Sequence, residues 1–335
     1  MKGKVKAKLS SFQNAKYLIS YDIARVLAVF FVLTMHIESG FNSYSGNSFG
    51  YLRVVGGYGV PIFFVISGFL ITKTINKDNS FKQFWRKRIV KIIPLYYILL
   101  MIYILGSQLF SSYLNKLQVI SYDKIITSLF FGFGEMNLSY ISASWSLWYE
   151  MIFYFCISLL LLSKESIIRK YTNQMTITIL VLNLYFYYIG SLFFYFTCGI
   201  FIFLIYNSKD TITIFLIHLL LLNIISLISL NNDNNALYIY FLFTILPIFE
   251  GKFNNLFPIA KKTINVLSKA SYSLYLTQVF TIPLFYKATY YTWGSKLSYS
   301  GSVFHCLCFT VLVSIIVWAY IERPITSFLY TYKHL

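Results

Sequence analysis

The sequence predicts an all-α, polytopic integral membrane protein with about ten transmembrane helices. Of its 335 residues, 58% are hydrophobic and only 12% are charged, which is about half the charged share of a typical soluble protein. The mean hydropathy is +0.66. Long apolar runs alternate with short polar segments, and the basic residues gather in those segments. A soluble fold of this length needs a far more polar surface, so the composition excludes one.

Ten apolar runs are candidates for the spans, because a membrane-crossing helix needs about 20 mostly apolar residues. They lie at about residues 18–37, 54–75, 89–110, 141–162, 174–189, 190–207, 211–230, 236–250, 270–291 and 301–321. The fifth, sixth and eighth runs are short or closely joined to a neighbour. The basic start of the chain resembles the first part of a signal peptide, but no small-residue cleavage site follows. We therefore expect the first run to remain as a span.

The basic residues predict the orientation of these spans. When the N-terminus is placed in the cytoplasm and the sides alternate, 22 of the 28 lysines and arginines fall on the cytoplasmic side and 5 fall outside. This bias follows the positive-inside rule and supports an even number of spans with both termini in the cytoplasm. We expect one membrane-embedded domain over residues 1–335, with a basic cytoplasmic segment at 1–17 and a short cytoplasmic tail at 323–335.

The net charge of +17 predicts contacts with anionic lipid headgroups and no nucleic acid as a partner. The basic residues stand in short clusters beside apolar runs, and no zinc-finger or RNA-binding signature accompanies them. The four cysteines all lie inside apolar runs, and their spacing matches neither a zinc site nor a disulfide framework. We therefore expect buried thiols and no metal.

The first span carries ionisable residues in the stretch "DIARVLAVFFVLTMH", which begins at Asp22. Arg25 and His36 are eleven residues apart, so they share one helix face and are separated by about 16 Å along the axis. Asp22 lies one turn before Arg25, near the same face. Intramembrane charges mark functional sites by default, and this stripe predicts a polar cavity. Alternatively, Arg25 reaches the lipid phosphates and His36 lies at the outer interface.

The fourth span contains Glu150 within "SASWSLWYEMIFYF", shortly after Trp145 and Trp148. A carboxylate inside a membrane needs a cationic or hydrogen-bonding partner. Arg25 and His36 are the candidates for that partner. A purely structural pair between helices is the alternative.

Two further stretches combine features of packing with features of a binding site. The second span, "GGYGVPIFFVISGFLIT", is rich in glycine and contains Ser67 and Pro61. It predicts either close helix packing or a cavity wall where a substrate meets the backbone. The third span begins with "FWRKRIVKIIPLYY". Its cations serve either as a cytoplasmic anchor or as a site for the phosphates of a nucleotide.

Taken in order, these stretches resemble the membrane acyltransferase-3 family, the O-acyltransferases of bacterial surface glycans. The resemblance spans nearly the whole chain. The matching stretches are "YDIARVLAVFFVLTMH", "GVPIFFVISGFLI", "FWRKRIVKIIPLYY", "WSLWYEMIFY", "ASYSLYLTQVF" and "IERPI". The chain departs from the family pattern at Pro61, where many members have Asp, and at Lys91, which replaces an arginine of an Arg-x-x-Arg pair. Lysine keeps the charge there but loses the bidentate fork.

The resemblance implies a reaction in the bacterial inner (cytoplasmic) membrane. An acyl group, most often acetyl, passes from cytoplasmic acyl-CoA to a hydroxyl of a surface polysaccharide or a lipid-linked glycan. Acetyl-CoA is then the donor substrate, and no metal is needed. The stretch "WSLWYEMIFY" resembles most the branch that modifies exopolysaccharide and O-antigen. Peptidoglycan as acceptor and succinyl as acyl group remain open.

The resemblance also implies roles for particular residues. His36 is the general base on the sugar hydroxyl, a role that suits neutral imidazole near pH 7, or it carries the acyl group covalently in a relay; direct and relayed transfer both stay open. Arg25 holds a donor phosphate or polarises the thioester. Glu150 either orients the imidazole, as a carboxylate does in a triad, or pairs with Arg25. The expected CoA-binding residues are Arg86, Arg88 and Lys91. The expected substrate-binding residues are Asp22, Ser67, Trp145 and Trp148.

A transporter or flippase for a glycan or a small anionic solute is the rival class. It also has many spans with charges near the midplane. It predicts internal repeats, which the sequence does not show, and it does not require these motifs in their family order. A passive membrane scaffold is a third class, and it tolerates the loss of His36.

Overall fold

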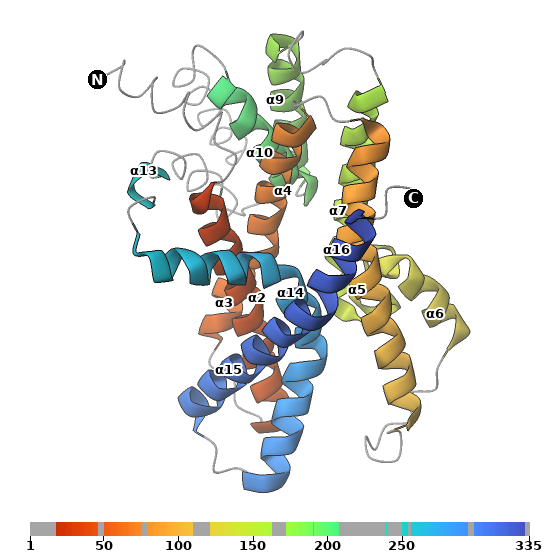
Figure 1. Cartoon of the computed structure of the whole chain (residues 1–335), viewed down its shortest axis with the longest axis vertical. Coiled ribbons are helices and arrows are strands. Elements are labelled where there is room, and N and C mark those ends of the chain that lie inside the picture. Colours follow the sequence, from red (N-terminus) through yellow and green to blue (C-terminus); the bar gives the residue numbers. More distant parts are fainter. Residues whose placement is uncertain are drawn as a thin grey trace. The chain divides into compact units, whose positions relative to one another are not determined.

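The computed structural model describes residues 18–45, 50–75, 80–109, 121–162, 172–189, 191–207, 239, 250–253, 256–293 and 298–331. Every regular element in this part of the chain is a helix, which confirms the all-α class (Figure 1). The longer helices are α2 (Ile19–Ser45), α4 (Gly59–Ile75), α5 (Phe81–Leu109), α7 (Trp145–Ser158), α9 (Thr172–Tyr188), α10 (Phe193–Asn207), α14 (Pro258–Trp293) and α15 (Tyr299–Val317). The shorter ones are α3 (Tyr51–Gly56), α6 (Tyr122–Leu129), η1 (Phe131–Gly134), η2 (Met136–Leu138), η3 (Ser142–Ser144), η4 (Leu159–Leu162), α13 (Glu250–Phe253), the π-helix η7 (Trp318–Glu322) and α16 (Arg323–Thr331).

Five helical stretches are long and apolar enough to cross a membrane. They are Ile19–Ser45, Leu52–Ile75, Phe81–Ser107, Ser142–Leu162 and Tyr299–Thr331. These match the first four predicted spans and the last one, so a multi-pass membrane protein is confirmed. The fifth and sixth predicted spans correspond to the shorter apolar helices Ile177–Tyr188 and Phe193–Leu204, and the ninth lies within α14.

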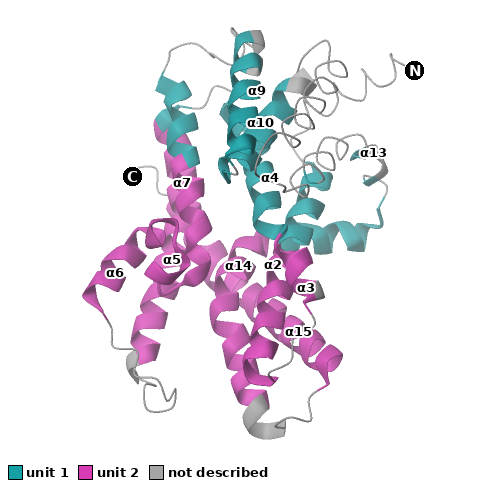
Figure 2. Cartoon of the chain, turned by 180° about the vertical axis from the view of Figure 1, so that it is seen from behind, with its two compact units in different colours: residues 1–28, 58–81, 153–268 teal, residues 29–57, 82–152, 269–335 magenta. Residues whose placement is uncertain are grey.

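The remaining two predicted spans, at 211–230 and 236–250, lie outside the described residues except for Ile239 and Glu250. Ten spans and two cytoplasmic termini therefore stay predictions. The helices group into two compact units (Figure 2). Unit 1 comprises residues 1–28, 58–81 and 153–268, and unit 2 comprises residues 29–57, 82–152 and 269–335. The expectation of a single domain also stays a prediction.

Unit 1 is held together by glycines that bring α4 and α10 into backbone contact. A Cβ atom at Gly68 would lie 2.1 Å from the carbonyl oxygen of Phe196, and one at Gly199 would lie 2.2 Å from that of Val65. No larger residue fits at either position. Small residues of this kind allow membrane helices to approach closely and gain van der Waals contact. Close packing, one of the two interpretations of the second span, is therefore realised at Gly68.

Aromatic and amide side chains complete the packing of unit 1. Phe196 stacks on Phe64, with ring centroids 4.2 Å apart, and on Phe153 at 4.3 Å. Asn183 of α9 is fully buried, and its Nδ2 donates to the carbonyl of Phe194 (3.1 Å) and to Thr197 Oγ1 (2.8 Å) on α10. An amide buried between apolar helices joins them because it has no water to bond.

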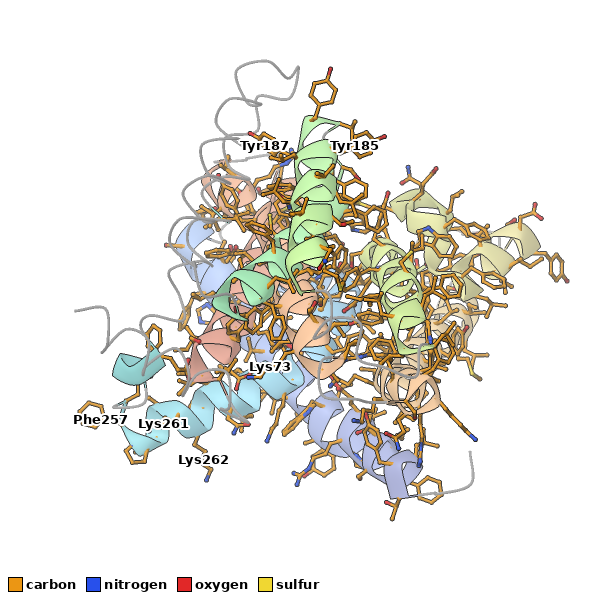
Figure 3. The ribbon with its side chains drawn as sticks, turned by 90° about the horizontal axis from the view of Figure 1, so that it is seen from above. Lys73, Tyr185, Tyr187, Phe257, Lys261 and Lys262 are labelled. Atoms are coloured by element: carbon orange, nitrogen blue, oxygen red, sulfur yellow. The ribbon has the colours of Figure 1, made fainter. Side chains whose placement is uncertain are left out.

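The N-terminal end of α14, also in unit 1, has the character of a membrane-surface segment. Phe257 and Ile259 are 82% and 81% exposed, and Lys261 and Lys262 follow them directly. Figure 3 shows Phe257, Lys261 and Lys262 at this end of the helix. Apolar side chains beside lysines suit the boundary between acyl chains and anionic headgroups, as expected for a partner of membrane lipids.

Unit 2 contains a ladder of hydroxyl contacts between α14 and α15. Thr277 Oγ1 lies 2.6 Å from Ser314 Oγ, and Thr281 Oγ1 donates to Thr310 Oγ1 at 3.2 Å. The residue numbers rise on one helix and fall on the other, so the two helices run antiparallel. Three of these hydroxyls also donate to a carbonyl one turn earlier in their own helix: Thr277 to Ser273 (2.8 Å), Thr281 to Thr277 (3.2 Å) and Ser314 to Thr310 (2.6 Å). These side chains keep their polar atoms paired in an apolar surrounding.

Candidate active site

Asp22 and Arg25 are placed together at the start of α2 in unit 1. The guanidinium Nη1 of Arg25 lies 3.9 Å from Asp22 Oδ1, and Ser268 Oγ of α14 donates to the same carboxylate oxygen. The Arg25 side chain is 37% exposed, whereas that of Asp22 is 15% exposed. The predicted i, i+3 relation is thus observed. Asp22 orients Arg25, whose side chain stays partly exposed.

A second carboxylate binds the first turn of α2, and the sequence analysis did not single it out. Glu250 of α13 accepts hydrogen bonds from the backbone N–H groups of Ile19 (2.8 Å) and Ser20 (3.0 Å). These groups have no partner within the helix, and a negative charge also suits the positive end of the helix dipole. Glu250 therefore anchors the end of α2 that carries Arg25. No local pattern announces this contact, since 230 or more residues separate the partners.

His36 lies on the part of α2 that belongs to unit 2 and is half-buried. Among the residues that the structure describes, it makes no hydrogen bond or ion pair. A bond between His36 and the carboxylate of Glu150 is accordingly not present in this arrangement. The imidazole is left available to an incoming group, which the role of a general base requires.

A buried carboxylate close to His36 in sequence has a structural task. Glu38 is 2% exposed and accepts hydrogen bonds from the backbone N–H groups of Gly50 (2.6 Å) and Arg53 (2.7 Å). It thereby satisfies the exposed donors at the start of α3. The first span was expected to end at residue 37, but α2 continues to Ser45. The sequence places Glu38 at the start of a polar outer loop, so its position in the pattern does not mark it as a structural residue.

Glu150 is half-buried on α7 in unit 2. In the same unit, Tyr275 Oη of α14 donates to the carbonyl of Ala143 (2.8 Å) and lies 2.7 Å from Ser146 Oγ. Tyr275 therefore joins α14 to η3 and to the start of α7, the helix that carries Glu150.

The basic cluster on α5 divides into residues with different partners. Arg86 Nη2 donates to the carbonyls of Leu329 (3.1 Å) and Tyr330 (3.0 Å) in the last turn of α16, and Tyr330 Oη donates to the carbonyl of Lys87 (3.1 Å). Arg86 therefore caps a helix C-terminus. The guanidinium of Arg88 lies 5.4 Å from the ring centroid of Phe84, a distance that permits a cation–π contact.

Lys91 forms an ion pair with Glu322 at the end of the π-helix η7, and Ser273 Oγ donates to the other oxygen of that carboxylate. The Glu322 side chain is 1% exposed, whereas Lys91 remains 42% exposed. The π-helix adds a residue to the turn and so redirects the side chain that follows; such bulges recur at functional sites. The sequence analysis did not anticipate this pair.

The remaining predicted substrate residues lie in both units. Ser67 is half-buried on α4 in unit 1, next to the packed Gly68. In unit 2, Trp148 meets Phe133 edge to face at 5.2 Å between ring centroids, and Trp145 meets Tyr149 likewise at 6.0 Å. Both tryptophans are half-buried. They pack within their own unit and keep part of their rings accessible.

The indole of Trp148 packs against a turn whose residues have left-handed backbone conformations. Residues Phe131 to Gly134 all have positive φ, from 49° to 85°, a region that non-glycine residues seldom adopt. A Cβ atom at Gly134 would lie 2.9 Å from Trp148 Cδ1. The two glycines of "FGFG" therefore permit both the turn and the close approach of the indole.

Within the described residues, the helices define a multi-pass membrane protein that carries ionisable groups inside its apolar spans. The acyltransferase-3 family model, described as an acyltransferase domain, matches residues 18–319. The chain belongs to this family, as its sequence motifs indicated. No solved structure matches it significantly.

Curated relatives match shorter segments. Peptidoglycan O-acetyltransferase OatA of Listeria monocytogenes is 34% identical over 104 residues, which are 29% of this chain and 15% of the relative. The putative peptidoglycan O-acetyltransferase YrhL of Bacillus subtilis is 31% identical over 148 residues, 42% of this chain and 20% of the relative. An O-acetyl transferase of Shigella phage Sf6 is 38% identical over 74 residues, 22% of each chain. The chain thus spans less than a quarter of the length of each relative in these matches.

Proposed function

We propose that this protein is an O-acyltransferase of the cytoplasmic membrane of a bacterium. It transfers an acyl group, most often acetyl, from acyl-CoA to a hydroxyl of a surface polysaccharide or a lipid-linked glycan. The observation that carries the proposal is the family match over residues 18–319 together with relatives that are named O-acetyltransferases. Membrane-spanning helices suit an enzyme whose donor and acceptor arrive from different sides.

The donor side of the proposal rests on the cations of α5. CoA carries several negative charges, and arginine and lysine bind phosphates well. Arg86 uses one nitrogen on the carbonyls of α16, and Lys91 pairs with Glu322 while 42% of its side chain stays exposed. In the proposal, Arg88 supplies the fork for a phosphate, and the other two cations add charge at the same end of the helix.

The chemistry rests on His36. Its neutral imidazole accepts the proton of a sugar hydroxyl while the hydroxyl oxygen attacks the carbonyl carbon of the thioester. The carbon–sulfur bond then breaks, and CoA leaves as the thiol after taking the proton from the imidazolium. Arg25, oriented by Asp22, holds a donor phosphate or polarises the carbonyl. Glu150 adds negative charge that stabilises an imidazolium.

Two classes of acceptor follow from different observations. The stretch "WSLWYEMIFY" favours an exopolysaccharide or O-antigen. The names of two relatives favour peptidoglycan. Both classes present sugar hydroxyls, so the same chemistry serves either one.

The decisive experiment uses a strain of the natural host that lacks the gene. Ester-linked acetate is measured by NMR and by mild base release, separately on purified peptidoglycan and on purified surface polysaccharide. The proposal expects one fraction to lose acetate on deletion and to regain it when the wild-type gene returns. Unchanged acetate in both fractions contradicts it.

A second measurement separates an enzyme from a transporter. Purified protein in detergent, mixed with acetyl-CoA, is expected to release free CoA slowly, and faster when a glycan acceptor is added. A transporter or flippase leaves the thioester intact. The scaffold alternative is excluded if the wild-type protein restores acetate and a His36 variant does not.

A further inference from the structure

Gln278 of α14, in unit 2, is a buried side chain whose amide oxygen and amide nitrogen are both unsatisfied among the described residues. It is 2% exposed, and neither of its amide atoms has a hydrogen-bond partner among the described residues. A buried polar group in this state costs about 1–3 kcal/mol. Its neighbours one turn away on α14 are both bonded, Tyr275 to Ala143 and Thr281 to Thr310. The stability of the helix bundle therefore does not explain the glutamine.

The contacts between α2 and α14 within unit 2 indicate which residue of α2 lies opposite Gln278. A Cβ atom at Gly40 would lie 2.8 Å from Cγ2 of Ile282, and one turn later Tyr44 stacks on Tyr286 with centroids 6.1 Å apart. The Cβ atom at Gly40 would also lie 2.9 Å from the ring of Tyr286, so the two helices run parallel here and Tyr286 lies between the levels of Gly40 and Tyr44. Extended back by about two turns, this register brings His36 near the level of Gln278. Residues four apart share a helix face.

The extended register brings two polar side chains close to one level, and neither bonds a protein group within the described part of the chain. His36 makes no hydrogen bond or ion pair with the described residues, and Gln278 makes none either. The proposed base on α2 and an unsatisfied amide on α14 therefore belong to one pair of packed helices.

We propose that Gln278 binds the acceptor sugar and presents its hydroxyl to His36, an inference that rests on the proposed glycan O-acylation. An amide offers an oxygen that accepts and an NH₂ group that donates. Two neighbouring sugar hydroxyls offer the complementary donor and acceptor and satisfy both ends of the side chain. The phosphates of CoA call for cations instead, and an acyl carbonyl pairs only with the NH₂ group and leaves the amide oxygen unsatisfied.

The test uses Gln278→Met, which keeps the length of the side chain and removes its hydrogen bonds. In the deletion strain, at equal protein level, ester-linked acetate on the host glycans is expected to fall at least tenfold. The melting temperature of the purified variant is expected to equal or exceed that of the wild type, because an unsatisfied amide has been removed. A role in folding alone predicts the opposite change in melting temperature.

Thr281→Val is the matched control, one turn further along the same helix. It removes a hydroxyl that already has a partner on α15, so acetate is expected to stay within twofold of the wild type while the melting temperature falls slightly. Release of CoA from acetyl-CoA without acceptor is expected to stay within twofold in Gln278→Met.

Three results overturn the assignment of Gln278. They are wild-type acetate in Gln278→Met, a larger loss of melting temperature than in Thr281→Val, or an equal loss of CoA release, which assigns the glutamine to the donor. A wild-type gene that fails to restore acetate refutes the proposed function itself, and the inference about Gln278 with it.

Discussion

The two units of the molecule use buried polar residues in different ways. In unit 1, the buried amide of Asn183 joins α9 to α10 and so serves helix packing. The hydroxyls between α14 and α15 do the same in unit 2, but unit 2 also holds polar groups of another kind. In unit 2, a lysine–glutamate pair, a half-buried histidine without a hydrogen bond and an unsatisfied glutamine lie among the spans. Packing alone requires none of these three features, since apolar side chains fill the same space at lower cost.

This difference teaches where chemistry is to be sought in a membrane protein. In lipid, the hydrophobic effect does not drive helices together, because the acyl chains are as apolar as the side chains. Van der Waals contact and hydrogen bonds between the helices must stabilise their association instead. A polar group that has a hydrogen-bond partner on another helix contributes to holding the helices together. A buried polar group without one costs free energy, so it is a candidate for contact with a ligand. By this criterion, the proposed reaction depends on His36 and Gln278 in unit 2.

The largest effect is expected for His36→Ala. Ester-linked acetate on the host glycans should fall about 100-fold or more, because general base catalysis contributes about 10²–10⁴-fold. The melting temperature should change little, since the imidazole has no hydrogen bond or ion pair to lose among the described residues.

Ser39→Ala serves as the control on the same helix. Ser39 is exposed and bonds only a carbonyl of its own helix, at Met35, so acetylation should be unchanged. If His36→Ala and Ser39→Ala both acetylate like the wild type, His36 is not the base and the contrast between the units loses its chemical meaning.

A second prediction addresses unit 1. Gly68→Ala places a methyl group where a backbone oxygen lies 2.1 Å away, so α4 and α10 must separate. Overpacking of this kind costs about 1–3 kcal/mol or more. We expect a clear fall in melting temperature and in the amount of folded protein, measured by thermal unfolding in detergent and by size-exclusion chromatography.

The control for Gly68 is Gly106→Ala on α5. A Cβ atom at Gly106 meets nothing within 4 Å, and alanine is the better helix former by about 1 kcal/mol. This variant should be as stable as the wild type or slightly more so. Equal melting temperatures for Gly68→Ala and Gly106→Ala would show that the glycine contact does not hold unit 1 together.

The smallest effect is expected for the ion pair of unit 2. Glu322→Gln and Lys91→Met should each lower the melting temperature, because each leaves one partner of a partly buried pair uncompensated. The double variant should lose less than the sum of the two, with a coupling of about 1 kcal/mol. The coupling energy is expected to be this small because solvent screens the partly exposed charge of Lys91. Additive losses would mean that the pair contributes nothing to the fold.

The sequence predicted the fold class well, because a membrane span is a local property. Twenty consecutive apolar residues announce a helix whatever surrounds them, and five predicted spans recur as long apolar helices. The ends of the spans were less predictable. The helix α2 continues past residue 37 to Ser45, and the carboxylate of Glu38 within this extension binds backbone donors at the start of α3, a contact that no local pattern reveals.

The candidate site was predictable only as a set of residue types. Charges inside apolar runs drew attention to Arg25, His36 and Glu150, and a helical repeat placed Asp22 beside Arg25, as observed. The partner of Lys91 was not predictable, since Glu322 lies 231 residues away. Gln278 was overlooked because an uncharged amide in an apolar run is an ordinary packing residue until its surroundings are known.

The sequence by itself determined that this chain is helical, spans a membrane and belongs to an acyltransferase family, because hydropathy and motif order are read along the chain. Only the tertiary structure decided which polar groups have partners. Pairing depends on the register between helices distant in sequence, as between α2 and α14. The free-energy cost of an unpaired polar group depends on its burial. Burial depends on the packing of several helices, so it cannot be predicted from one stretch of sequence.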